Sequence, residues 1–305
     1  MKVLVVGGAG FLGSHLTERL LAEGHAVDVV DDLRTGSLAN LSQARSLGGE
    51  LKIHTLDAGS ADFRTLASMR NPDVIYHLGL LPPGIPAEHA AAPTLGSLMS
   101  VLEAARDLGG VKVVAALSAV ALYGDVPARD QPVKESQPWN PVGVRGVVSR
   151  AIAEMLAVYR EHHSVEFTAL AMTNVYGPRQ RPEAGVVAAF AHAIREGITP
   201  MVHGDGRQTR DFLYVDDAVD ALVRAALKGS GLVVNIGTGT ATSVRDLWDL
   251  IAGPDGRPPA PSPRRDLDVN RFALSPTRAR IHLAWAPWTD LATGVRHLGQ
   301  RFSGA

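Results

Sequence analysis

The sequence contains no cysteine among its 305 residues. This absence excludes disulfide bonds, thiolate nucleophiles and zinc sites with cysteine ligands. It does not point to a compartment, because a chain without thiols tolerates oxidising and reducing surroundings alike. Any chemistry must therefore come from other side chains or from a bound cofactor.

The chain also lacks an excess of charge of one sign and a long apolar run. The 30 Lys and Arg residues nearly balance the 31 Asp and Glu residues, so nucleic acid and anionic membrane surfaces are poor candidate partners. Apolar stretches such as residues 111–117 are far shorter than the roughly 18 to 20 residues of a membrane span. The chain begins with a strand-like run rather than a signal peptide. We therefore expect a soluble, cytoplasmic protein that binds a small-molecule substrate.

The order of apolar runs and helical patterns predicts the fold class. Strand-like runs alternate with helical patterns through the first half of the chain, which is typical of an α/β, Rossmann-type doubly wound parallel sheet. We expect a dinucleotide-binding domain over residues 1–172, with later segments, about 207–240, returning to it. Residues 173–305 are expected to form mainly a smaller, non-contiguous substrate-binding lobe. The strand-like runs are residues 2–6, 26–30, 51–56, 74–78, 111–117 and 165–171.

A glycine-rich segment follows the first predicted strand and opens the first predicted helix. Gly7, Gly10 and Gly13 would let the backbone approach a pyrophosphate, and the helix that follows offers unpaired N–H groups to it. The spacing is GxxGxxG rather than GxGxxG, and a glycine pattern alone is a weak signal. Its position between strand and helix, with Asp31 about 20 residues further on, strengthens the prediction of a dinucleotide site. Phe11 and Leu12 belong to the same predicted site.

Acidic residues follow the second and third predicted strands. The Asp31 carboxylate is suited to accept from the ribose hydroxyls of adenosine, with Asp32 beside it. Asp57 is placed to receive the adenine edge, although an ordinary strand-end aspartate is nearly as common. Asp31 would repel a 2′-phosphate whereas Arg34 would attract one, so the cofactor prediction is NAD(P)H with the choice open. Leu78, after the fourth predicted strand, is the last of the predicted cofactor-binding residues in this part of the chain.

Several longer motifs resemble those of the extended short-chain dehydrogenases/reductases, which include sugar-nucleotide epimerases and dehydratases. The resemblance covers almost the whole chain. It implies that Asn174, Arg210 and Arg265 help to hold the diphosphate of a sugar nucleotide, and that two long helices, over residues 94–108 and 147–159, pair in a homodimer. The motifs are GGAGFLGSHL (7–16), DDLRTG (31–36), NVYGPR (174–179), GDGRQTRDFLYVDD (204–217) and NIGTG (235–239).

The chain departs from that family at the usual catalytic residues. The family pairs a Tyr with a Lys one helical turn later, and adds a Ser or Thr and a supporting Asn. Here these positions fall on Gly146, Arg150, Ala119 and Thr94. Arg150 is still suited to bind cofactor ribose hydroxyls, but a guanidinium keeps its proton and completes no relay. Ser118 is a weak candidate donor to the reacting oxygen.

These losses favour reduction over oxidation. Oxidising a sugar hydroxyl needs a base, whose loss costs on the order of 10²- to 10⁴-fold, whereas a ketone receives its proton from water or from an acidic substrate group. The sequence-based prediction is therefore an atypical NAD(P)H-dependent ketoreductase acting on a bulky, aromatic, polyketide-like product in antibiotic biosynthesis. The lost catalytic set resembles that of an atypical ketoreductase that acts on angucyclinones.

The predicted substrate-binding residues are Pro83, Tyr123, Gly146, Asn174 and Arg210. The absence of a side chain at Gly146 is expected to clear space for a flat ring system. Stiff apolar walls for such a ligand would come from Pro82, Pro83, Ile85, Pro86 and Trp139.

Two other functions stay open. A sugar-nucleotide epimerase or dehydratase with relocated catalytic groups is favoured by Asn174 and Arg210 and opposed by Gly146 and Ala119. A non-catalytic NAD-binding protein would keep binding and lose turnover. The histidines show no helical metal-ligand spacing, so no metal site is predicted.

Overall fold

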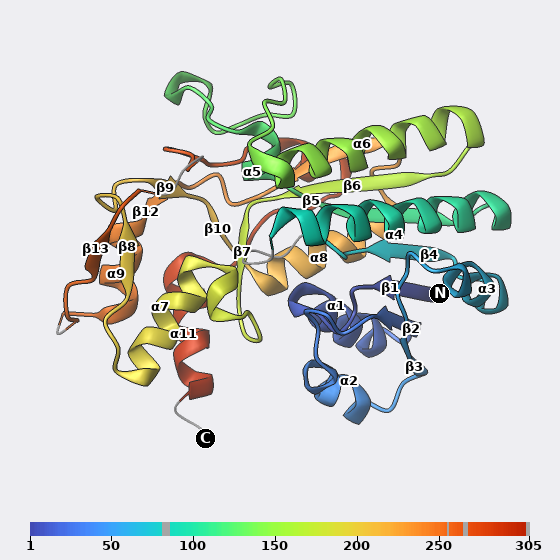
Figure 1. The fold of residues 1–305 in the computed structure, drawn as a ribbon, viewed down its shortest axis with the longest axis horizontal. Coiled ribbons are helices and arrows are strands. Elements are labelled where there is room, and N and C mark those ends of the chain that lie inside the picture. Colours follow the sequence, from blue (N-terminus) through green and yellow to red (C-terminus); the bar gives the residue numbers. More distant parts are fainter. Residues whose placement is uncertain (81–85, 255, 265–267, 303–305) are drawn as a thin grey trace.

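The computed structural model describes residues 1–80, 86–254, 256–264 and 268–302. Its centre is a parallel seven-stranded sheet with the strand order β11-β6-β5-β4-β1-β2-β3 (Figure 1). The prediction of a Rossmann-type, doubly wound α/β fold is confirmed. The strands are β1 (Lys2–Val6), β2 (Ala26–Asp31), β3 (Leu51–Thr55), β4 (Val74–His77), β5 (Lys112–Ser118), β6 (Phe167–Met172) and β11 (Leu232–Ile236).

Helices cover both faces of the sheet. Successive residues of β1 enter opposite cores: Val3 and Val5 pack on the side of α1 and α8, and Leu4 and Val6 on the side of α3, α4 and α6. This burial on both faces explains the continuous apolar runs, since a parallel sheet leaves neither face to water. The helices are α1 (Phe11–Ala22), α2 (Ser42–Ser46), α3 (Ala61–Arg70), α4 (Ala87–Leu108), α6 (Gly143–His163) and α8 (Val215–Leu227).

The rest of the chain forms a smaller group of elements beside the carboxyl ends of the strands (Figure 1). Phe190 and Trp248 pack edge to face in its core, with their ring centroids 5.0 Å apart. Three small sheets pair β10 with β7, β12 with β9 and β13 with β8. Their strands are β7 (Asn174–Tyr176), β8 (Met201–His203), β9 (Thr209–Arg210), β10 (Phe212–Tyr214), β12 (Thr242–Ser243) and β13 (Ala260–Ser262). The helices here are α7 (Val186–Glu196), α9 (Val244–Ala252) and α11 (Leu291–Phe302), whereas α10 (Thr277–His282) packs against β11 of the main sheet.

The chain returns to the main sheet after entering this smaller group. β11 pairs in parallel with β6, and α8 packs on α1. Part of the segment 207–240 therefore returns to the main sheet, through α8 and β11. The division into two domains stays a prediction. Short helices not foreseen from the sequence are α5 (Ala119–Tyr123), η1 (Leu38–Leu41), η2 (Ala128–Asp130) and η3 (Pro182–Ala184). Among the described residues, no helix is long and apolar enough to cross a bilayer.

Candidate active site

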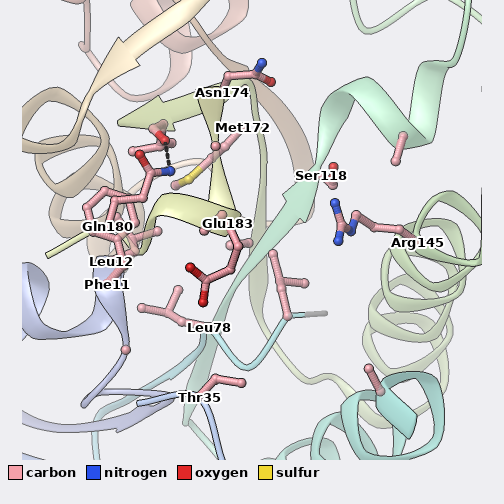
Figure 2. A pocket seen from close by; sticks show the side chains of 18 of the residues that line it. Phe11, Leu12, Thr35, Leu78, Ser118, Arg145, Met172, Asn174, Gln180 and Glu183 are labelled. Atoms are coloured by element: carbon pink, nitrogen blue, oxygen red, sulfur yellow. Dashed lines mark hydrogen bonds between the residues drawn. The ribbon is translucent and has the colours of Figure 1, made fainter. Parts of the chain in front are cut away.

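A cavity of about 840 Å³ opens where the carboxyl ends of the strands face the smaller group of elements. One end is lined by the glycine turn after β1, and the other by Arg210 and Asp268. Ligands of open α/β sheets bind at this edge, where the strand order changes direction. The cavity is therefore the candidate active site (Figure 2).

The glycine turn is built for close approach of backbone to backbone and of backbone to ligand. Gly7 has φ +80°, and a Cβ there would lie 3.1 Å from Gly79 N. A Cβ on Gly13 would lie 2.1 Å from Gly7 O, so only glycine lets α1 pack onto the turn. Gly10 precedes α1 without a side-chain cap, and Gly10, Phe11 and Leu12 line the cavity. The free N–H groups of the first helical turn suit a pyrophosphate.

Asp31 lies at the end of β2 and ties down the glycine turn. Its Oδ2 accepts from Ala9 N at 2.9 Å, and its Oδ1 accepts from Leu33 N at 2.9 Å. Burial raises the pKa of Asp31, while these two N–H donors oppose that rise. The carboxylate lines the cavity, and its remaining lone pairs fit the ribose role predicted for it.

Arg34 is held by two carboxylates at the same end of the cavity. Its Nε donates to Asp32 Oδ2 at 2.6 Å, and its Nη2 donates to Asp57 Oδ2 at 3.3 Å. All three residues line the cavity, as does Leu78. Because its charge is already neutralised, Arg34 is poorly placed to attract a further phosphate.

Two residues at the usual catalytic positions lie away from the cavity wall. Arg150 is half exposed and donates from Nε to Glu154 Oε1 at 2.7 Å. Ala119 is fully buried at the start of α5. Ser118 does line the cavity, and its backbone N–H donates to Ser149 Oγ at 3.2 Å. The predicted cofactor role of Arg150 has no geometric support here and stays a prediction.

The expectation that Gly146 opens space for a ligand is wrong. A Cβ on Gly146 would lie 2.2 Å from Ala121 O and 3.1 Å from Pro141 C. The Ala121 carbonyl also accepts from Val142 N at 2.8 Å. The backbone between β5 and α6 therefore fills the place where a tyrosine side chain would begin, and Gly146 does not line the cavity.

Arg145, the neighbour of Gly146, does line the cavity, and sequence reasoning missed it. Figure 2 shows its guanidinium extending from α6 toward Ser118. Its Nε is buried without a hydrogen-bond partner, and desolvation lowers the pKa of Arg145. The available signal was a cation one residue before the position of the missing tyrosine.

Tyr123 and His77 serve the interior rather than the cavity. Tyr123 is buried, and its hydroxyl donates to Asn235 Oδ1 at 2.9 Å. It does not line the cavity, so its predicted substrate contact lacks support. His77 is fully buried with Nε2 2.8 Å from Ser97 Oγ, and burial lowers its pKa to about 4. Thr94 lines the cavity, but its hydroxyl donates to Ala90 O at 2.8 Å.

Asn174 and Arg210 lie where a sugar nucleotide was predicted to bind. Asn174 begins β7 and lines the cavity (Figure 2). Arg210 also lines it, donates to Thr209 O at 2.8 Å and pairs with Asp268. Burial lowers the pKa of Arg210, and Asp268 opposes that fall.

The proposed apolar walls find little support. Trp139 packs against the buried cluster on the α6 side of the sheet, and neither it nor Pro86 is among the cavity-lining residues. Pro82, Pro83, Ile85 and Arg265 lie outside the described residues.

Glu183 is a second cavity residue that sequence reasoning missed. It belongs to η3 and lines the cavity (Figure 2), and its carboxylate is about half exposed and forms an ion pair with Arg181. A hydrogen bond from its own backbone, with further help from Arg181, lowers the pKa of Glu183. Within the described part of the chain, no group of acidic and histidine side chains forms a metal site.

The chain is similar to several proteins whose names refer to UDP-sugars. Residues 3–237 match the NAD dependent epimerase/dehydratase family. The chain is 40% identical to a UDP-glucose 4-epimerase of Mycolicibacterium smegmatis, covering 97% of this chain and 96% of that protein. It is 31% identical to UDP-glucuronic acid decarboxylase 1 of Xenopus tropicalis, covering 96% of this chain and 70% of that protein.

Solved structures that share the fold of this chain carry similar names. The UDP-glucose 4-epimerase of Thermotoga maritima with UDP-glucose superposes with a TM-score of 0.93 at 31% identity, covering 99% of both chains. The UDP-glucose 4-epimerase of Thermus thermophilus in complex with NAD gives a TM-score of 0.90 at 31% identity, covering all of both chains.

These comparisons correct the functional prediction. A ketoreductase of antibiotic biosynthesis acting on a polyketide-like substrate is contradicted, because the similar proteins are named for UDP-sugars, and the relative at 40% identity is a UDP-glucose 4-epimerase. The missing Tyr and Lys mark a local change at two positions, whereas the motifs that agree with the family span the chain. The predicted nicotinamide dinucleotide cofactor and the resemblance to extended short-chain dehydrogenases/reductases are confirmed at the level of the family. The chain belongs to the NAD dependent epimerase/dehydratase family.

Proposed function

We propose that this protein is an NAD-dependent epimerase that inverts a hydroxyl-bearing carbon of a UDP-sugar, with proton-transfer groups moved from their usual positions. One observation carries the proposal: 40% identity to a UDP-glucose 4-epimerase over nearly the whole length of both chains. The cavity supports it, because a single space joins the glycine turn to Asn174 and Arg210.

The β1–β4 end of the cavity fits the dinucleotide. The turn from Gly7 to Leu12 presents backbone N–H groups to a pyrophosphate, and Asp31 faces a ribose. Bound NAD would supply the hydride acceptor that such a reaction needs. The carboxylates of Asp32 and Asp57, which neutralise Arg34, favour NAD over its 2′-phosphorylated form.

The opposite end fits the diphosphate of a nucleotide sugar. Arg210 is buried and oriented by Asp268, so its remaining N–H groups are held in place before a ligand arrives. Asn174 adds an amide on the same wall. A sugar bound between these ends would lie beside Ser118 and Glu183.

Glu183 is the proposed proton acceptor. The other described carboxylates on the cavity wall lie at its ends: Asp31, Asp32 and Asp57 beside the glycine turn, and Asp268 paired with Arg210. The lowered pKa of Glu183 keeps it ionised at neutral pH. A carboxylate of low pKa is a weak base, so we expect slow turnover.

The test is conversion of UDP-galactose to UDP-glucose by the NAD-loaded protein, followed through the anomeric proton signals by NMR. We expect slow conversion without net change in NADH, reduced about 10²-fold or more by Glu183→Gln. Glu196→Gln, an exposed carboxylate at the end of α7 outside the cavity, is the matched control.

The proposal is overturned if the NAD-loaded protein converts neither UDP-galactose nor UDP-galacturonic acid to its C4 epimer. If UDP-sugars and NAD bind without conversion, the chain is instead a non-catalytic NAD-binding protein, which the loss of the usual catalytic set at Gly146 and Arg150 would then explain. Conversion that Glu183→Gln leaves unchanged would remove Glu183 from the account and leave the epimerase intact.

A further inference from the structure

Arg145 is a cation without a partner anion on the wall of the cavity. It is the third residue of α6, and its guanidinium points toward Ser118 (Figure 2). The other arginines lining the cavity, Arg34 and Arg210, each pair with a carboxylate. Among the described residues, no acidic side chain forms an ion pair with Arg145, and its buried Nε has no hydrogen-bond partner.

The location makes this unpaired charge more costly. α6 begins without a side-chain cap and without an acidic residue in its first turn. Its N-terminus therefore carries uncompensated positive potential, to which Arg145 adds a full charge. A shielded guanidinium without a partner is destabilising, and folded chains retain such a group when it has a ligand to bind.

Under the proposed function, an anion other than the phosphates is left for Arg145 to bind. The glycine turn would hold the pyrophosphate of the dinucleotide, and Arg210 and Asn174, which line the same cavity, would hold the diphosphate of the sugar nucleotide. Arg145 lies between these ends, beside Ser118, where the sugar itself would lie. A planar guanidinium binds a carboxylate through two parallel hydrogen bonds.

We propose that Arg145 binds the carboxylate of a UDP-hexuronic acid, so that the substrate is an acidic rather than a neutral sugar nucleotide. This inference rests on the proposed function and deepens it. Ser118 stands beside the expected carboxylate and provides a hydroxyl to the same sugar face. The apolar neighbours Val120, Val142 and Val148, which also line the cavity, would shield the ion pair from water.

The test measures binding to the NAD-loaded protein by titration calorimetry with UDP, UDP-glucose and UDP-glucuronic acid. We expect UDP-glucuronic acid to bind at least tenfold more tightly than UDP-glucose. Arg145→Gln should abolish this preference through a loss of affinity for UDP-glucuronic acid, and UDP should still bind. Arg145→Lys keeps the positive charge and loses the two parallel N–H donors of the guanidinium, so this variant should keep part of the preference for UDP-glucuronic acid. Arg160→Gln, an exposed arginine on the same helix, is the matched control.

A second readout does not depend on activity. Arg145→Gln should raise the Tm of the ligand-free protein, because it removes an unpaired shielded charge. In the wild type we expect UDP-glucuronic acid to raise the Tm more than UDP-glucose does, and Arg145→Gln should abolish this difference.

The outcomes separate the two proposals. Equal affinity for both sugars, or a preference that survives Arg145→Gln, overturns the role of Arg145 while UDP-sugar binding stands. If UDP itself does not bind, the proposed function and this inference fail together.

Discussion

Gly146 offers a sharp test of the account of the missing tyrosine. The backbone after β5 occupies the place of the lost side chain, so that even a methyl group does not fit. A Cβ on Gly146 would meet Ala121 O at 2.2 Å, and this oxygen is backbone that cannot rotate away. Gly96, a glycine in α4, is the matched control because no atom lies within 4 Å of its added Cβ.

The two substitutions to alanine should change stability in opposite directions. Alanine at Gly96 should raise the free energy of unfolding by about 1 kcal/mol, the usual difference in helix propensity between Gly and Ala. At Gly146 the same gain is outweighed by overpacking of about 1 to 3 kcal/mol. Displacing Ala121 O also strains its hydrogen bond from Val142 N, worth about 1 kcal/mol. The two variants should therefore differ by roughly 3 kcal/mol.

The measurement is denaturant unfolding of both variants with bound NAD absent. We expect Gly146→Ala to unfold at lower denaturant concentration than the wild type, and Gly96→Ala at higher. If Gly146→Ala is as stable as Gly96→Ala, the segment between β5 and α6 has room for a side chain. The close packing argued for the site would then be refuted.

Three further predictions concern pH, cofactor choice and assembly. Burial raises the pKa of Asp217 to about 6, above its ordinary 3.8. The stability that protonated Asp217 contributes is therefore present in acid and is lost as pH rises from about 4 to 6. Asp217→Asn should flatten this part of the Tm–pH curve, and an unchanged curve would contradict the prediction. NADH should bind at least tenfold more tightly than NADPH by fluorescence titration, because Asp32 and Asp57 neutralise Arg34; equal affinities would refute this. We also propose a homodimer through α4 and α6, because Val147 on α6 is an exposed apolar residue suited to an interface. Val147→Glu should halve the mass measured by light scattering. A wild type that is already monomeric would exclude the dimer.

The fold was predictable because its signals are local and mutually consistent. The run of β1, the glycine turn and the start of α1 follow one another directly, and each needs a residue type that the sequence shows. Asp31 was likewise identified from its position after β2, and it lies on the cavity wall. A parallel sheet buried on both faces leaves continuous apolar runs that are hard to mistake.

The centre of the site was less predictable because it depends on distant segments. Whether Gly146 opens a space depends on Ala121, which approaches through the turn between β5 and α6. Arg145 and Glu183 lie on different elements, and nothing in their local sequence indicates that both reach one cavity. Tyr123 shows the converse error, since its motif position suggested a ligand contact but its hydroxyl is bound to Asn235 in the interior.

The fate of a hydrogen isotope tests the central claim most directly. The NAD-loaded protein would be incubated with UDP-galactose and UDP-galacturonic acid that carry deuterium at sugar carbon 4, and the products followed by NMR. The account predicts that at least one of them is converted to its C4 epimer with the deuterium retained and no net NADH formed. Conversion of neither, or loss of deuterium to water during conversion, would contradict it.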